Sequence, residues 1–90
     1  MRLKLERDPD ADALYIKLAD KPYAFGEDFG DERRVDYAAD GTPIGIELLC
    51  VSQGVDLTDL PHAERLAGLL KGQGLRVLAH RTSKSRPTTP

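Results

Sequence analysis

The sequence predicts a small α+β domain: an antiparallel β-meander of two hairpins, four to five strands in all, with one C-terminal helix packed on its apolar face. Three observations support this fold class. Apolar and polar residues alternate in residues 2–6, 13–18 and 35–49, which is the period of half-buried strands. Asp40-Gly41 interrupts the last of these runs, as a hairpin turn does. After Cys50 the apolar period lengthens to that of a helix.

The hairpin of residues 35–49 is the strongest local signal. Asp40-Gly41 predicts a type I′ turn, because both central positions of that turn need a positive φ. A four-residue loop is the alternative, and it shifts the partners by two without changing which side chains share a face. The type I′ turn predicts these pairs: Arg34 with Glu47, Val35 with Ile46 and Tyr37 with Ile44. The predicted apolar face consists of Leu3, Leu5, Leu14, Ile16, Leu18, Val35, Tyr37, Ile44, Ile46 and Leu48.

The other elements follow in chain order. Residues 7–12 are predicted to be the turn of the first hairpin, and residues 19–32 a loop in which Tyr23–Phe25 can add a short edge strand. A helix capped by Thr58 or Asp59 is expected to end at Gly72, and a last strand to cover residues 75–79. We therefore expect a single domain over residues 1–81 and a disordered tail over residues 82–90.

Composition limits the class of protein. The 90 residues carry a net charge of −2, with no apolar run of the roughly 18 residues that a membrane helix needs. The charged start of the chain does not resemble a signal peptide, and one cysteine fits a reducing compartment, so we expect a cytoplasmic protein. The basic residues after Leu75 lack interleaved aromatic residues, which does not favour nucleic-acid binding.

The acids of the first turn are the candidate metal ligands. Asp8, Asp10 and Asp12 alternate like the first ligands of an EF-hand loop. Ala13 stands where that loop needs Gly, and Ala19 where it needs a bidentate Glu, so a structural turn is predicted and a weak divalent-cation site is the alternative.

The remaining polar candidates indicate no catalytic centre. Asp36 and Glu47 share the outer face of the main hairpin, where two carboxylates can act as acid and base, but Arg34 opposite Glu47 favours a structural ion pair. His62 and His80 have no second ligand at metal spacing, and Cys50 ends the inward row as a small core residue. We expect no catalytic residue, no cofactor and no resident metal.

Residues 2 to 52 resemble the small bacterial family called domain of unknown function 2283. The resemblance rests on the runs at residues 8–18, 35–37, 40–41 and 44–49, with Asp-Ala-Leu-Tyr-Ile and Gly-Ile-Glu as its signatures. Ala38 and Pro43 depart from the usual pattern. The resemblance implies a compact, β-rich cytoplasmic protein of prokaryotes with no established activity, substrate or cofactor. Such proteins look like companions of small toxin-like proteins, which favours an antitoxin-like or adaptor role.

Together these observations predict a non-catalytic protein-interaction module. The alternative is a divalent-cation-binding or hydrolase-like protein that uses Asp8, Asp10 and Asp12. We also expect the Tyr15 ring to lie over Gly45, because aromatic cover stabilises a glycine inside a strand. A homodimer and a protein partner are expected, because the following apolar residues have no place in one small core: Tyr23, Phe25, Phe29, Leu49 and Leu78.

Overall fold

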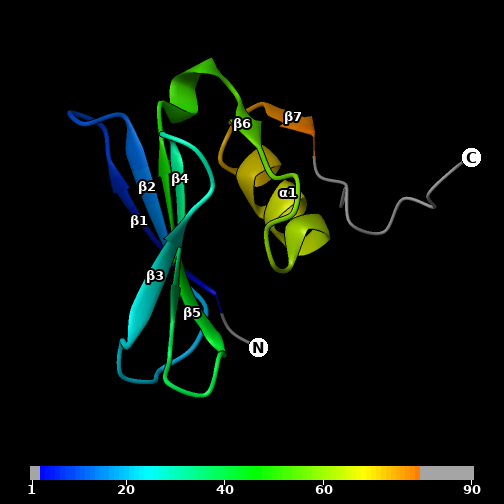
Figure 1. Ribbon diagram of the computed structural model, residues 1–90. Helices are drawn as coiled ribbons and strands as arrows, with labels where there is room; N and C mark the ends of the chain where they lie inside the picture. Colours follow the sequence, from blue (N-terminus) through cyan, green and yellow to red (C-terminus); the bar gives the residue numbers. More distant parts are fainter. Residues whose placement is uncertain (1–2, 80–90) are drawn as a thin grey trace, which may run out of the picture. The chain divides into compact units, whose positions relative to one another are not determined.

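The computed structural model describes residues 3–79, which divide into two compact units (Figure 1). The first unit ends at Val51, and the second begins at Ser52. A single domain over residues 1–81 stays a prediction, and the tail predicted for residues 82–90 lies outside the described residues.

The first unit is an antiparallel sheet of five strands in the order β1-β2-β5-β4-β3. The last of these five strands in the sequence, β5, therefore lies in the centre of the sheet, and β1 and β3 form its two edges. The two predicted hairpins are β1 with β2 and β4 with β5, and together with the helix they confirm the α+β class. The strands are β1 Lys4–Asp8, β2 Ala13–Lys17, β3 Phe25–Asp28, β4 Arg33–Tyr37 and β5 Pro43–Leu49.

The predicted apolar face is confirmed by burial. Ile16, Val35 and Ile46 are fully buried, and they occupy matching positions on β2, β4 and β5. Leu3, Leu5 and Tyr37 are half-buried. The other predicted members of the face are buried: Leu14, Leu18, Ile44 and Leu48. Packing of the helix on this face stays a prediction.

The main turn differs from the type I′ prediction. Gly41 has φ 87°, whereas Asp40 is not among the residues with positive φ. The Gly41 N–H donates to the Ala38 carbonyl (3.0 Å), and the Ala38 N–H donates to the Thr42 carbonyl (2.9 Å), so the loop has three residues. Such a loop combines a type I turn with a left-handed glycine and a bulge. The bulge lies between Asp36 and Tyr37, so Tyr37 faces Pro43 instead of Ile44.

The segment predicted as a loop at residues 19–32 contains a complete strand. The possible edge strand at Tyr23–Phe25 is shifted, and β3 runs over Phe25–Asp28 beside β4. Gly26 and the acids of this strand oppose strand formation by intrinsic preference, and pairing with β4 overrides that preference.

The second unit contains a short parallel pair and one helix. After the 3₁₀ turn Val51–Gln53, β6 Val55–Asp56 pairs with β7 Val77–Ala79, and α1 Ala63–Gly72 connects them. The strand predicted for residues 75–79 is present as β7, and its partner β6 was not predicted from the residue pattern. No helix within residues 3–79 is long and apolar enough to cross a membrane.

The N-terminal end of α1 differs from the prediction, whereas its C-terminal end agrees with it. The N-cap is His62, with φ 58°, and neither Thr58 nor Asp59 occupies that position. At the other end the Leu75 N–H donates to the Leu70 carbonyl (3.0 Å), and the Gly74 N–H donates to the Lys71 carbonyl (3.0 Å). These two bonds, with Gly74 at φ 79°, form a Schellman motif that stops the helix after Gly72.

Candidate functional site

The outer face of the sheet is organised around Asp36. Its neighbours in the register are Gly26 on β3 and Gly45 on β5, so a carboxylate lies between two strand glycines. The Tyr15 hydroxyl donates a hydrogen bond to Asp36 Oδ2 (3.3 Å), and Arg34 Nε donates to Asp36 Oδ1 (3.3 Å). Both carboxylate oxygens therefore have a partner.

Each of the two glycines is covered by one of these partners. A side chain at Gly45 would overlap the Tyr15 hydroxyl and ring, which confirms the prediction that this ring lies over the glycine. A side chain at Gly26 would overlap the Arg34 guanidinium in the same way. This second cover was not predicted from the residue pattern, because residues 19–32 resemble a loop; once β3 is known to be a strand, the rule that applies to Gly45 applies to Gly26 as well.

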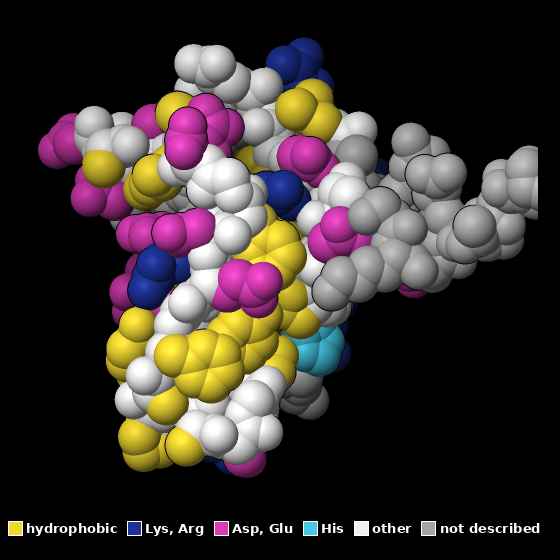
Figure 2. Space-filling model, viewed as in Figure 1, with side chains coloured by type: hydrophobic (Ala, Val, Ile, Leu, Met, Phe, Trp, Pro, Cys, Tyr) yellow, Lys and Arg dark blue, Asp and Glu magenta, His cyan; other side chains and the backbone are white. Residues whose placement is uncertain are grey.

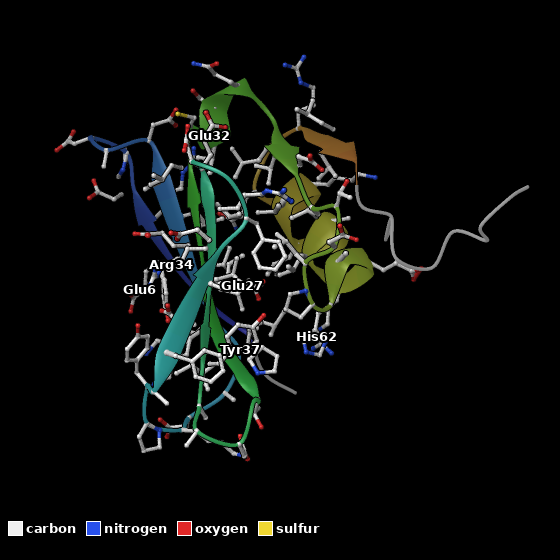
Figure 3. The ribbon with its side chains drawn as sticks, in the orientation of Figure 1. Glu6, Glu27, Glu32, Arg34, Tyr37 and His62 are labelled. Atoms are coloured by element: carbon white, nitrogen blue, oxygen red, sulfur yellow. The ribbon has the colours of Figure 1, made fainter. Side chains whose placement is uncertain are left out.

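Arg34 connects the Asp36 centre to the β3 edge. It lies opposite Glu47 in the register, as predicted, but its guanidinium pairs elsewhere. Arg34 Nη1 binds Asp28 Oδ1 (3.0 Å), and Nη2 donates to the Tyr23 hydroxyl (3.2 Å). Arg34 thus forms structural ion pairs, as predicted, but its partners are Asp36 on its own strand and Asp28 on β3. Figure 3 shows Arg34 and Glu6 on the left side of the sheet and Tyr37 and Glu27 nearer its right side.

The opposite face carries an aromatic stack at the beginning of β3. The Phe25 and Tyr37 rings lie 5.0 Å apart at an interplanar angle of 18°. Phe25 remains 48% exposed, and the Tyr37 hydroxyl donates to Glu27 Oε1 (3.3 Å). Tyr23, just before the strand, is 57% exposed, and its hydroxyl bonds to Arg34 of the outer face. Figure 2 shows hydrophobic side chains gathered where Figure 1 draws the lower half of β3, with acidic side chains above them.

Two tyrosines of these clusters have raised pKa values. Partial burial is the main cause of the raised pKa of Tyr15, and the adjacent Asp36 charge adds to it. Partial burial likewise raises the pKa of Tyr37, with a further contribution from Glu27. Both hydroxyls are therefore protonated hydrogen-bond donors at neutral pH, which suits a structural or binding role.

The predicted metal ligands form a turn. The Asp8 carboxylate accepts a hydrogen bond from the Ala11 N–H (3.2 Å), and the Asp12 N–H donates to the Pro9 carbonyl (3.2 Å). No group of three or more His, Cys, Asp or Glu side chains among the described residues is placed to hold a metal ion. Asp8, Asp10 and Asp12 thus share a turn without forming a cation cage.

Two of the remaining candidates, Cys50 and His62, are among the described residues. Cys50 follows β5 at φ 56° and is half-buried, so it lies at the margin of the core that was predicted for it. A hydrogen bond with Glu32, together with the Glu32 charge, raises the pKa of the Cys50 thiol. His62 is exposed at the start of α1, and His80 lies outside the described residues.

Two shallow depressions flank Glu47 on the outer face. One of about 420 Å³ lies toward β1 and the first turn, and one of about 230 Å³ lies toward the loop between β3 and β4. The first is bordered by Tyr15, the second by Arg34. Both are open and are lined in part by charged side chains.

Comparison with known proteins identifies the family of the first unit. Neither the curated proteins nor the solved structures include a match to this chain. A family model described as protein of unknown function (DUF2283) matches residues 4–52, a span that contains all five strands of the sheet. Since the match covers more than half of the 90 residues, the chain belongs to the DUF2283 family.

Proposed function

We propose that this chain is a non-catalytic protein-interaction module that self-associates as a homodimer and binds a partner protein through the beginning of β3. The observation that carries the proposal is the group of aromatic residues at the beginning of β3, hereafter the aromatic edge: Tyr23 and Phe25 are exposed, and Tyr37 stacks on Phe25. Aromatic residues are enriched in protein interfaces because a rigid ring buries much area at a low entropic cost.

The state of the acidic residues also supports a binding role. Asp36 accepts hydrogen bonds from two side chains, and Asp8 accepts one from a turn amide. Carboxylates held this way fix local geometry, and neither depression beside Glu47 is enclosed enough to exclude water from a reaction. The role proposed for this module is that of an adaptor or antitoxin-like protein.

The homodimer is tested by sedimentation equilibrium of the full chain at micromolar concentration. We expect a mass of twice 9.9 kDa that falls on dilution. A mass that stays at 9.9 kDa through the dilution series removes the dimer from the proposal.

The partner surface is tested by affinity purification from the native host with a matched pair of variants. Phe25→Ser changes the aromatic edge, and Leu78→Ser changes an apolar side chain that is similarly exposed (58%) but lies in the second unit. We expect the wild type and Leu78→Ser to recover the same partner, and Phe25→Ser to lose it. Equal recovery by all three proteins, or no specific partner with any of them, contradicts the proposal.

A further inference from the structure

Among residues 3–79, no strand pairs with the outer side of β3, so the backbone groups on that side have no ladder partner there. The Phe29 N–H donates to the Arg33 carbonyl across the ladder (2.8 Å). Backbone groups in an antiparallel pair alternate between the two sides of a strand, so Glu27 also turns toward β4. Gly26 and Asp28 therefore direct their N–H and C=O groups away from β4, toward the free edge of the sheet.

The two edges of the sheet differ in how well they are protected. In β1 the only uncharged residue is Leu5, and its four charged residues are of both signs. Charged side chains along an edge oppose the addition of another strand. β3 instead starts with Phe25 and Gly26, an exposed ring followed by a residue without a side chain. β3 is thus the more open edge.

The side chains of β3 favour a positively charged strand at the free edge of the sheet. Residues 22–32 contain no Lys or Arg, and their acids are Glu27, Asp28, Asp31 and Glu32. Phe25 and Glu27 share one face of the strand, and Asp28 points to the other. An added antiparallel strand therefore meets Glu27 and the aromatic stack on one face, and Asp28 in its ion pair with Arg34 on the other.

We infer that β3 accepts an extended, basic segment of a partner protein as an additional antiparallel strand. An aliphatic residue of that segment packs beside Phe25, and two successive basic residues face Glu27 and Asp28. The segment bonds to the free N–H and C=O groups of Gly26 and Asp28, which is the strand-addition mode of peptide recognition. This inference rests on the proposed function and names the chemistry of its partner.

A second copy of this chain is the less suitable occupant of β3. Antiparallel pairing of two β3 strands places Glu27 and Asp28 of both copies within one short ladder. Like charges near one another across strands are destabilising. A basic segment instead places positive side chains beside these carboxylates, so charge complementarity favours a different protein over a second copy of this chain.

The test uses a defined peptide and the full chain. The probe is acetyl-Thr-Lys-Lys-Thr-Val-Thr-amide, which in antiparallel register sets its lysines against Asp28 and Glu27 and its valine against Phe25. Its control has both lysines replaced by glutamate. In ¹⁵N-labelled protein we expect the lysine peptide at millimolar concentration to shift the amide signals of Gly26 and Asp28, with the shifts decreasing as salt is added. Equal shifts with the glutamate peptide, shifts centred elsewhere, or no shifts overturn the inference.

A pair of variants separates the backbone contribution from the charge. Asp28→Ala removes the carboxylate and its ion pair with Arg34 but keeps the edge N–H. Asp28→Pro removes the N–H as well, and proline is tolerated on an edge strand where that group faces outward. We expect the proline variant to bind the lysine peptide about twofold to twelvefold more weakly than the alanine variant, the range for one net hydrogen bond. Equal binding by the two variants overturns strand addition.

Two further measurements separate strand addition from misfolding of the proline variant and from the proposed function itself. A lysine peptide N-methylated at its first lysine and at the threonine after its second lysine lacks the two amides that face Asp28 and Gly26, and it should bind wild-type protein more weakly whether or not the proline variant folds. The host partner supplies the second check. Loss of that partner with Phe25→Ser but retention with Asp28→Pro preserves the proposed function and overturns the mode of binding inferred here.

Discussion

The ring of Tyr15 occupies the space above Gly45 that a side chain at that position would need. Gly45→Ala must displace the ring and weaken its hydrogen bond to Asp36. We expect the variant to lose about 1–3 kcal/mol of unfolding free energy, the usual cost of overpacking. Urea denaturation measures this loss.

A double-mutant cycle checks the cause of that loss. With Tyr15→Ala already in place, the added methyl group at Gly45 meets no ring, so its penalty should shrink by at least about 0.5 kcal/mol. An unchanged penalty in the Tyr15→Ala background would show that the strand itself, and not the ring, requires glycine.

Alkaline pH should weaken the sheet through Tyr15. Its pKa in the folded protein is raised above the ordinary 10.0, so the folded state retains this proton to higher pH than the unfolded state does. The associated stability is complete below pH 10.0 and is lost as the pH rises through the folded pKa. Urea unfolding across this range, with Tyr15→Phe as the control, should show a steeper decline for the wild type. Parallel curves for the two proteins would contradict the expectation.

Two glycines of the second unit should respond oppositely to alanine. Gly68 lies inside α1, and a methyl group there meets no atom within 4 Å, so Gly68→Ala should raise stability by about 1 kcal/mol. Gly74 is left-handed at φ 79°, so Gly74→Ala should lower stability despite similar open space. Melting temperatures of the two variants test this contrast. A shift of both in the same direction would mean that helix preference and the Schellman motif do not set these effects.

Divalent cations should not stabilise the chain specifically. Asp8 already accepts the Ala11 N–H, and the described residues lack a three-ligand cluster. Titration with calcium, magnesium or manganese at constant ionic strength should leave the melting temperature unchanged. A saturable rise of several degrees that disappears in Asp10→Asn would instead favour the cation-binding alternative.

The faces of the sheet were predictable because alternation alone determines them. Val35 and Ile46 would remain on one face in either hairpin register considered, and both are buried. The exact turn was not predictable, because Asp-Gly suits a type I turn followed by a left-handed glycine as well as it suits type I′. Choosing the former adds a residue to the loop, and the bulge beside Tyr37 absorbs it.

The part of the candidate site around Gly45 was predictable from the sequence. The part that involves β3 was not. A glycine inside a strand is stabilised by an aromatic ring that covers it, and Tyr15 lies on the same face of the sheet as Gly45. The pairing of Arg34 with Asp28 requires a fifth strand whose residues, taken one by one, resemble a loop. Only the ladder with β4 defines that strand, and a ladder is a relation between segments distant in the chain.

The central position of β5 orders events during synthesis on the ribosome. The β1–β2 and β3–β4 hairpins emerge first, and each is a two-stranded ribbon of marginal stability by itself. Neither can join the other until residues 43–49 leave the exit tunnel and insert between them. The nascent sheet therefore closes in one late step, and a pause in translation while residues 43–49 are still inside the tunnel would prolong the exposure of two unjoined hairpins.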